Sequence, residues 1–378
     1  MNNKRKILIV GDFGSIHIYN YAKNVLAFCD ADIHGFNIGG PVCSIDSLFM
    51  ETYNQLGIKI QGGIKLKQGK IAYMRKAYNV LSKMGSYDYC HVHFVSHYIC
   101  PIIFLLRHKY TVINLSFWGS DLYRVNYIAR SLYRPLIYRS KIISFITTDM
   151  LNSFKKLYPQ KKLQKTFRIL DFGNPFLRTI DSFRQSAERE SLYDLIHLNS
   201  NKKTLTIGYR WLRKMRQYET LTYILPILDK KNIQIAIPAY GIPKEEKERI
   251  DSLISSFDIE HQIYDYFMGE QEVSALRCLT DVFIHPQTTD ALSNAMLEHI
   301  YAGSVVLNGE WLNYSILDEN DVYYLKFKSL SELPAVLQKI ISNLDTHQER
   351  ARKNCDIVRS FISWEYWTPK WLELYNNN

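Results

Sequence analysis

Short apolar runs alternate with polar loops and amphipathic stretches along most of the chain, and this alternation predicts strands joined by helices. In the first half, strands are expected at 6–10, 31–36, 57–60, 87–94, 111–117, 142–147 and 168–171. In the second half, they are expected at 203–208, 232–238, 262–267, 282–284, 304–307 and 322–327. Helices are expected between them, including 244–256, 272–279 and 330–343. Such a pattern is typical of α/β domains with doubly wound parallel sheets.

The length of 378 residues suffices for two domains, each with a core of its own. Residues 181–203 are polar and charged and show few strand signals, so we interpret them as a linker that opens the second domain. The predicted domains are therefore 1–180 and 181–360, followed by a short C-terminal segment, 361–378.

The stretch from Asp281 to Gly309 is the part of the chain that offers most for chemistry. Pro286 closes its first strand, because the proline ring cannot donate a hydrogen bond into a parallel ladder. Ser293 or Asn294 is a favourable N-cap for the helix that follows, and Gly303 is a favourable stop. The helix start then aims unpaired N–H groups and a positive dipole end at the preceding loop, where a phosphate can bind.

Two carboxylates frame this turn. Asp290 lies in the loop before the cap, and Glu298 lies about one turn inside the helix. The helix dipole has faded at that depth, so Glu298 could accept hydrogen bonds from two ligand hydroxyls, such as a ribose diol. Spacing alone leaves the alternative open that Glu298 is a solvated helix residue and Asp290 an ordinary turn former.

Five residues of this stretch keep the spacing of a known signature: Pro286, Asp290, Glu298, Ala302 and Gly303. The signature is Pro-Ser-x-x-Glu-Gly-x-Gly-x-x-x-x-Glu with a following Ala/Cys-Gly, and the stretch therefore resembles family 4 of the GT-B glycosyltransferases. Asp290 stands where that family has Glu. Ala291 and Ser293 stand where it has Gly, which leaves less room for a sugar diphosphate against the backbone.

The resemblance implies a fold and a set of ligands. The fold would be GT-B, with two Rossmann-like doubly wound domains that face a central cleft. The donor would be a nucleoside-diphosphate sugar, with no cofactor and no obligatory metal. Segment 361–378, which begins Phe-Ile-Ser-Trp-Glu-Tyr-Trp, resembles the tail by which GT-B chains cross back to the first domain.

The resemblance also implies donor-side roles. Glu298 would hold the ribose and Asp290 the hydroxyls of the donor sugar. In GT-B enzymes the first loop of the second domain places cations on the donor diphosphate, and the candidates here are Arg210, Lys214 and, in reserve, Arg213. Phe267 and Met268 resemble the loop that holds the base through backbone groups. Ser293 and Asn294 complete the predicted donor-binding set.

Acceptor-side candidates follow the expected strands of the first domain. Gly11 and Gly14 permit close ligand approach, and Asp12, Ser15 and His17 share their loop, although capping and turn roles are equally open for them. His97 follows strand 87–94, with no acidic partner at metal-binding spacing.

Trp118-Gly-Ser-Asp121 ends strand 111–117 and resembles a turn of the Fuc4NAc transferases of enterobacterial common antigen, which are inverting GT-B enzymes. An acid at the carboxyl end of a strand can act as a general base or bind acceptor hydroxyls. The alternative is that Asp121 caps the next helix. The predicted catalytic residues are therefore Asp121, His17 and Asp290.

The net charge of +10 suits phosphorylated ligands, an anionic membrane face or nucleic acid. No helix-turn-helix, zinc-finger or RNA-binding pattern is present, so we expect no nucleic acid partner. Segments 65–76 and 123–141 mix cations with tyrosine and other apolar residues. They predict either solvated helix faces or a surface for anionic lipid headgroups. No apolar run has the length of a bilayer span, and the six cysteines lack metal-binding spacing.

Together these patterns predict a cytoplasmic glycosyltransferase that can lie peripherally on the inner face of the cell membrane. It would transfer a sugar to a saccharide or lipid-linked acceptor in bacterial surface polysaccharide synthesis, as for O-antigen or capsule. Two other interpretations stay open. One is a GT-B-like sugar-nucleotide epimerase. The other is a non-catalytic saccharide- or membrane-binding protein with a degenerate donor site, which the two missing glycines favour.

Overall fold

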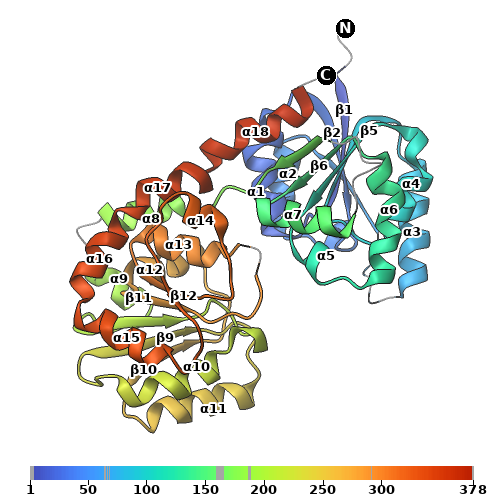
Figure 1. Cartoon of the computed structure of the whole chain (residues 1–378). Helices are drawn as coiled ribbons and strands as arrows, with labels where there is room; N and C mark the ends of the chain where they lie inside the picture. Colours follow the sequence, from blue (N-terminus) through green and yellow to red (C-terminus); the bar gives the residue numbers. More distant parts are fainter. Residues whose placement is uncertain are drawn as a thin grey trace. The chain divides into compact units, whose positions relative to one another are not determined.

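The computed structural model describes residues 4–63, 65, 67, 69–158, 166–185, 189–290 and 292–376, which form two compact units (Figure 1). Unit 1 comprises residues 1–173 together with 364–378, and unit 2 comprises residues 174–363. Each unit is an α/β domain whose neighbouring strands run parallel, as the sequence pattern predicted. Ala291, one of the positions where family 4 has glycine, lies outside the described residues.

The sheet of unit 1 has the strand order β3-β2-β1-β4-β5-β6-β7. Its strands are β1 (Arg5–Gly11), β2 (Ala31–Asn37), β3 (Lys59–Gly62), β4 (Tyr87–His93), β5 (Tyr110–Phe117), β6 (Ile142–Phe145) and β7 (Thr166–Ile169). Successive residues of β1 from Ile7 to Val10 are all buried, because helices cover both faces of the sheet.

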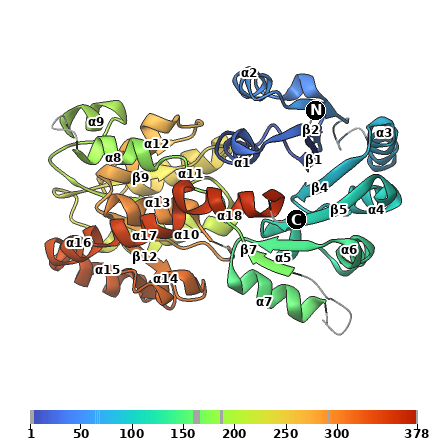
Figure 2. The ribbon, with the colours of Figure 1, turned by 90° about the horizontal axis from the view of Figure 1, so that it is seen from above.

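The helices of unit 1 are α1 (Ile16–Asn24), α2 (Ser47–Gln55), α3 (Lys70–Lys83), α4 (Cys100–Leu105), α5 (Ser120–Tyr123), α6 (Tyr127–Arg139), α7 (Thr148–Leu157) and α18 (Trp364–Asn376). Helices α1 and α2 lie on one side of the sheet, and α3, α4 and α6 lie on the other (Figures 1 and 2). Helix α6 continues through Pro135, although a proline inside a helix removes one backbone hydrogen bond. Pro135 is exposed, so water can satisfy the carbonyl that its missing N–H leaves unpaired.

Helix α18 belongs to unit 1, although the chain reaches it only after completing unit 2. Trp364, Trp367 and Trp371 pack into the core formed by α1, α2 and the sheet. The indole of Trp371 also donates a hydrogen bond of 2.7 Å to the carbonyl of Asp171. The chain thus passes from one unit to the other after residue 173 and again after residue 363. The sequence predicted these boundaries a few residues away, at 180 and 360.

The sheet of unit 2 has the order β10-β9-β8-β11-β12-β13. Its strands are β8 (Lys203–Ile207), β9 (Ile233–Pro238), β10 (Glu260–Tyr264), β11 (Val282–His285), β12 (Val305–Gly309) and β13 (Leu325–Phe327). Its helices are α8 (Leu177–Gln185), α9 (Arg189–Leu195), α10 (Gln217–Ile224), α11 (Lys244–Ser255), α12 (Glu270–Leu279), α13 (Asn294–Ala302), α14 (Ser315–Glu319), α15 (Leu333–Ser342), α16 (Leu344–Arg352) and α17 (Asn354–Ile362).

The interpretation of residues 181–203 as a linker is wrong. They contain the end of α8, helix α9 and the first residue of β8. Leu192 and Ile196 are buried in a core cluster that includes Tyr264 and Leu276. The sequence did not predict these helices because their few apolar residues stand among charged ones. Only the residues that pack against them in the folded chain show that the apolar positions form a buried stripe.

In both sheets the order of strands reverses at one place. In unit 1, β2 lies on one side of β1 and β4 lies on the other side. In unit 2, β9 and β11 lie on opposite sides of β8 in the same way. Loops that leave two adjacent strands in opposite directions open a crevice at the carboxyl ends of those strands. In doubly wound sheets this topological switch point is where ligands bind.

Candidate active site

Two predicted groups of residues meet at the switch point of unit 2. The loop after β8 carries Arg210, Arg213 and Lys214, and the loop after β11 carries Asp290. The N–H of Thr288 donates to the carbonyl of Lys214 at 2.9 Å, so the two loops lie side by side. Arg210 and Arg213 are exposed, and Lys214 is partly buried. Cations and an acid therefore lie where a ligand of this sheet is expected.

Helix α13 begins and ends as predicted. The Ser293 hydroxyl accepts a hydrogen bond from the N–H of Met296, which makes Ser293 the N-cap, and Asn294 is the first helical residue. Gly303 ends the helix in the left-handed conformation, with φ of 94°. The predicted apolar stripe is buried: Met296, Leu297, Ile300 and Tyr301. The N-terminal end of α13, with its positive dipole, therefore follows directly on the loop that carries Asp290.

Asp290 is held by a residue that the sequence analysis missed. The hydroxyl of Tyr314, after β12, lies 3.4 Å from the Asp290 carboxylate and 3.3 Å from Nε2 of His285. His285 is fully buried, and burial lowers its pKa to about 3, so its ring is neutral. The Tyr314 hydroxyl donates its hydrogen to Asp290 and accepts one from Nε2–H of His285. These two hydrogen bonds orient the Asp290 carboxylate.

Glu298 lies in a buried ion pair. Its side chain is 5% exposed, and that of its partner Arg277 is 6% exposed. The Nε atom of Arg277 donates to Oε2 of Glu298 at 3.1 Å. Asn174 Nδ2 donates to the other oxygen at 3.0 Å, and Arg277 also donates to Nε2 of His299 at 3.0 Å. Both carboxylate oxygens are thus engaged within unit 2. Ribose binding by Glu298 stays a prediction, and a diol would bind to a carboxylate that already accepts from Arg277 and Asn174.

The predicted base-binding loop follows β10. Phe267 is 77% exposed, whereas the side chain of Met268 packs in a core cluster with Leu276 and is not accessible to a ligand. Tyr240, in the loop after β9, contacts Phe267 edge to face at 5.5 Å. This pair of exposed rings offers an apolar surface to a flat ligand, and the Tyr240 contribution has no local sequence signal.

The loop after β1 lies at the switch point of unit 1, as the acceptor-side prediction requires. Within it, Asp12 Oδ1 accepts from the N–H of Gly14 at 3.1 Å. The Ser15 hydroxyl caps α1 by accepting from the N–H of Ile18 at 3.3 Å. A Cβ on Gly11 would lie 3.0 Å from the end of the Ile18 side chain, so a larger residue there would crowd α1. The turn and cap roles are therefore observed, and ligand contacts stay a prediction.

The two predicted histidines of unit 1 occupy different surroundings. The ring of His17 lies between Trp118 and Phe172, with centroid distances of 5.5 and 5.6 Å, and burial lowers its pKa. His97 is partly exposed beside Tyr98, and partial burial together with the charge of Lys70 lowers its pKa. Both rings are neutral at pH 7, so either could accept a proton but neither carries a fixed charge.

Asp121 is a buried acceptor of backbone hydrogen bonds. One carboxylate oxygen accepts from the N–H groups of Trp118 and Gly119, and the other accepts from Val95, all at 2.9 Å. Burial raises the pKa of Asp121 to about 7, against these donors, which lower it. The alternative role of Asp121 as a helix cap is not observed. Gly119 is the N-cap of α5, and Asp121 lies in the first turn of that helix. The acid thus fixes the turns after β4 and β5.

Replacing Asp121 with asparagine should lower the free energy of unfolding by about 1–3 kcal/mol. The amide has one acceptor oxygen, so an N–H of Trp118, Gly119 or Val95 loses its partner. Urea denaturation of the whole chain measures the change. Asp46→Asn is the control, because asparagine caps α2 as well as aspartate does. Equal stability of the Asp121 variant and wild type would contradict the proposed hydrogen bonds.

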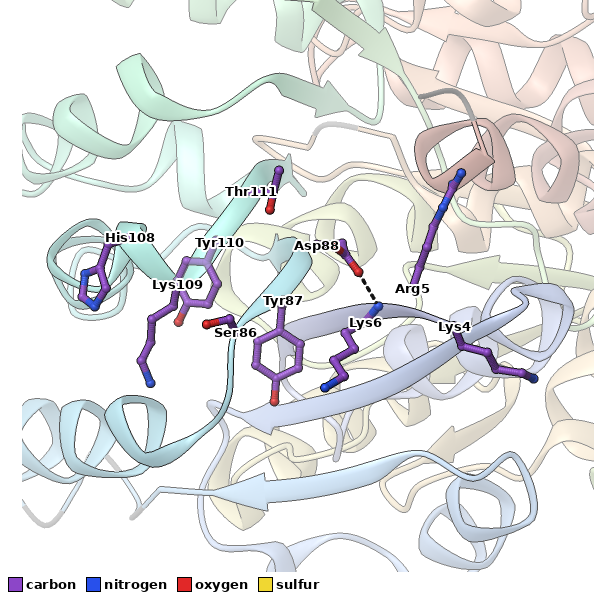
Figure 3. Close-up of a pocket in the computed structure, with 10 residues that line it drawn as sticks. All are labelled: Lys4, Arg5, Lys6, Ser86, Tyr87, Asp88, His108, Lys109, Tyr110 and Thr111. Atoms are coloured by element: carbon purple, nitrogen blue, oxygen red, sulfur yellow. Dashed lines mark hydrogen bonds between the residues drawn. The ribbon is translucent and has the colours of Figure 1, made fainter. Parts of the chain in front are cut away.

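A cavity of about 480 Å³ lies at the amino ends of β1, β4 and β5 (Figure 3). It is rich in cations, but the side chains of Lys4, Arg5 and Lys6 point in different directions (Figure 3). Lys4 pairs with Asp30, and Arg5 donates to the carbonyl of Tyr375. The cavity lies at the amino edge of the sheet, opposite the loop after β1, and is therefore separate from the candidate site. Among the described residues, no group of three or more His, Cys, Asp or Glu side chains could hold a metal ion.

Comparison with known proteins finds a family model that matches part of the chain, and solved structures that share its fold. Residues 6–148 match the model of the glycosyl transferase 4-like family. No curated protein sequence matches the chain. Among solved structures, HepE (Alr3699) from Anabaena, crystallised with UDP and glucose, has a TM-score of 0.74 at 12% identity, over 99% of this chain and 100% of that one.

Two further structures have similar scores. Sucrose-phosphate synthase from Thermosynechococcus elongatus has a TM-score of 0.74 at 12% identity, over 98% of each chain. A glycosyltransferase from Rickettsia africae has a TM-score of 0.73 at 13% identity, over the whole of both chains. At such identities the likeness concerns the fold. The chain therefore has the GT-B fold of two Rossmann-like domains, and its residues 6–148 are similar to the glycosyl transferase 4-like family.

Proposed function

We propose that this protein is a glycosyltransferase that uses a nucleoside-diphosphate sugar as donor. The observation that carries the proposal is the meeting of two loops at the switch point of unit 2, joined by the hydrogen bond from Thr288 to Lys214. One loop supplies cations, and the other supplies an acid and leads into the N-terminus of α13. A nucleoside diphosphate that carries a hydroxyl-rich sugar has chemistry complementary to both loops.

In the proposed reaction unit 2 binds the donor. Arg210 and Lys214, with Arg213 in reserve, neutralise the charge that develops on the diphosphate as the glycosidic bond breaks. The N-terminus of α13 adds its dipole. Asp290, oriented by Tyr314, accepts hydrogen bonds from hydroxyls of the donor sugar. Phe267 and Tyr240 offer their rings to the base.

Unit 1 binds the acceptor in this proposal. In this proposal the acceptor hydroxyl gives its proton to a neutral base, and the candidate is His17, in the first turn of α1. Asp121 acts by holding the turns after β4 and β5, near which His97 lies. Gly11, Asp12, Gly14 and Ser15 shape the loop that the acceptor approaches.

The donor and acceptor classes are part of the same proposal. HepE was crystallised with UDP and with UDP-glucose, which makes a uridine nucleotide the first donor to test. The turn Trp118–Asp121, which resembles Fuc4NAc transferases, supports a saccharide or lipid-linked acceptor in bacterial surface polysaccharide synthesis. An enzyme for such an acceptor works at the inner face of the cell membrane.

Calorimetric titration of the whole protein with UDP, GDP and dTDP tests the donor site. We expect micromolar binding of one nucleotide, much weaker binding of the corresponding nucleoside, and release of that nucleotide from its sugar conjugate when an acceptor is supplied. Conversion of the nucleotide sugar without any acceptor would support an epimerase instead. Absence of binding by all three nucleotides, in a folded sample, would overturn the proposal in favour of a non-catalytic protein.

A further inference from the structure

The positive charge of the protein is concentrated in one segment. Residues 65–141 contain 13 Lys and Arg but only 2 Asp and Glu, a net charge of +11, whereas the whole chain carries +10. The rest of the chain is therefore close to neutral, with a net charge of −1. A charge excess confined to about a fifth of the chain indicates a surface with an anionic partner and does not reflect general solubility.

Three helices of this segment form one layer. Helices α3, α4 and α6 cover the same side of the unit 1 sheet, with α4 packed between the other two (Figures 1 and 2). None of the three contains an Asp or Glu. The acids of the segment are Asp88, in β4, and Asp121, which is buried. We call this layer the basic face, and its exposed cations are Lys70, Arg75, Lys76, Lys83, Arg134 and Arg139.

The basic face also exposes large apolar side chains. Ile71 of α3 is 84% exposed, Leu105 of α4 is 60% exposed, and Tyr127 and Ile128 of α6 are 72% and 71% exposed. Leu132 lies one turn after Ile128 and is exposed as well. Exposed aliphatic groups next to one another on a helix are unfavourable in water, and they mark a surface that binds another apolar phase.

We propose that the basic face docks on an anionic lipid bilayer. Its lysines and arginines attract the headgroups, and Ile71, Leu105, Ile128 and Leu132 enter the boundary between headgroups and acyl chains. A second copy of the chain is disfavoured, because two such faces repel each other. Nucleic acid is disfavoured, because a phosphate backbone does not cover exposed aliphatic groups. Among the described residues, no helix is long and apolar enough to cross a membrane, so the contact would be peripheral.

This inference deepens the membrane part of the proposed function but does not depend on the donor loops. The basic face belongs to unit 1, whereas the donor loops belong to unit 2. Vesicle binding without nucleotide binding would contradict the transferase alone, and nucleotide binding without vesicle binding would contradict the docking surface alone.

Vesicle co-sedimentation of the full chain tests the docking surface. We expect binding to phosphatidylcholine vesicles that contain about a quarter phosphatidylglycerol, little binding to pure phosphatidylcholine, and weakening by salt. Lys76→Gln/Lys83→Gln removes two exposed charges from α3 and should weaken binding by about 30-fold. Ile128→Ser/Leu132→Ser keeps the charge but should weaken binding at least about tenfold.

The matched control removes the same charge from unit 2. Lys231→Gln/Lys244→Gln replaces two exposed lysines outside the basic face and should leave vesicle affinity within about twofold of wild type. Equal losses in this control and in Lys76→Gln/Lys83→Gln would overturn the proposal, because net charge alone would then explain binding. So would an unaffected Ile128→Ser/Leu132→Ser variant, or duplex DNA that displaces the protein from vesicles. Circular dichroism confirms that each variant is folded.

Discussion

Replacing Arg210 and Lys214 together with alanine is expected to weaken nucleoside-diphosphate binding by about 100-fold or more. A charge-assisted hydrogen bond to phosphate contributes roughly 1.5–3 kcal/mol, several times the contribution of a solvated surface charge. Both residues belong to the loop that the Thr288–Lys214 hydrogen bond ties to the Asp290 loop. Calorimetric titration with the nucleotide that wild type binds measures the effect, and Arg213→Ala shows whether the reserve cation contributes.

Two controls separate loss of the diphosphate contact from other causes. Lys231→Ala/Lys244→Ala removes the same net charge from unit 2. Lys231 precedes β9 and Lys244 begins α11, so neither belongs to the loop after β8, and this variant should bind the nucleotide as wild type does. The affinity for the nucleoside without phosphates should be similar in the Arg210/Lys214 variant and wild type. If the double variant binds the diphosphate as tightly as wild type, the assignment of this loop to the diphosphate fails.

The parts of the site that sequence could predict are those set by neighbours along the chain. The cap at Ser293, the stop at Gly303 and the buried stripe of α13 depend on side chains within a few residues of one another. The ends of β1, β5 and β11 follow from apolar runs and from Pro286 in the same way. Local signals of this kind fix the strand–loop–helix units on which the candidate residues stand.

The parts that sequence could not predict depend on partners far along the chain. Asp290 is oriented by Tyr314, and Glu298 is neutralised by Arg277 on another helix. Neither partner belongs to the donor-binding signature, so spacing around Pro286 could not find them. The choice between a solvated helix and a lipid surface at residues 123–141 was open for the same reason. The packing of α4 against α6 shows which side chains of α6 remain exposed.

Replacing Arg277 with methionine is expected to lower the free energy of unfolding by about 3–5 kcal/mol. Arg277 is buried and donates to both Glu298 and His299, and burial keeps the pKa of His299 well below its usual value, so the ring is neutral. Methionine fills much of the arginine volume but donates nothing. The Glu298 carboxylate would then be buried with only the neutral Asn174 amide as a partner.

The companion variant Arg277→Met/Glu298→Gln shows whether the loss comes from an unpaired charge. Removing both partners of a buried pair is far less costly than removing one, so the double variant should recover most of the stability that Arg277→Met loses. Arg249→Met removes an exposed arginine of α11 that stacks on Tyr218, and it should cost under about 1 kcal/mol. Urea denaturation of the full chain compares the three. If Arg277→Met were no less stable than Arg249→Met, Glu298 would not depend on Arg277, and the carboxylate would be free to serve the ribose as the family resemblance implies.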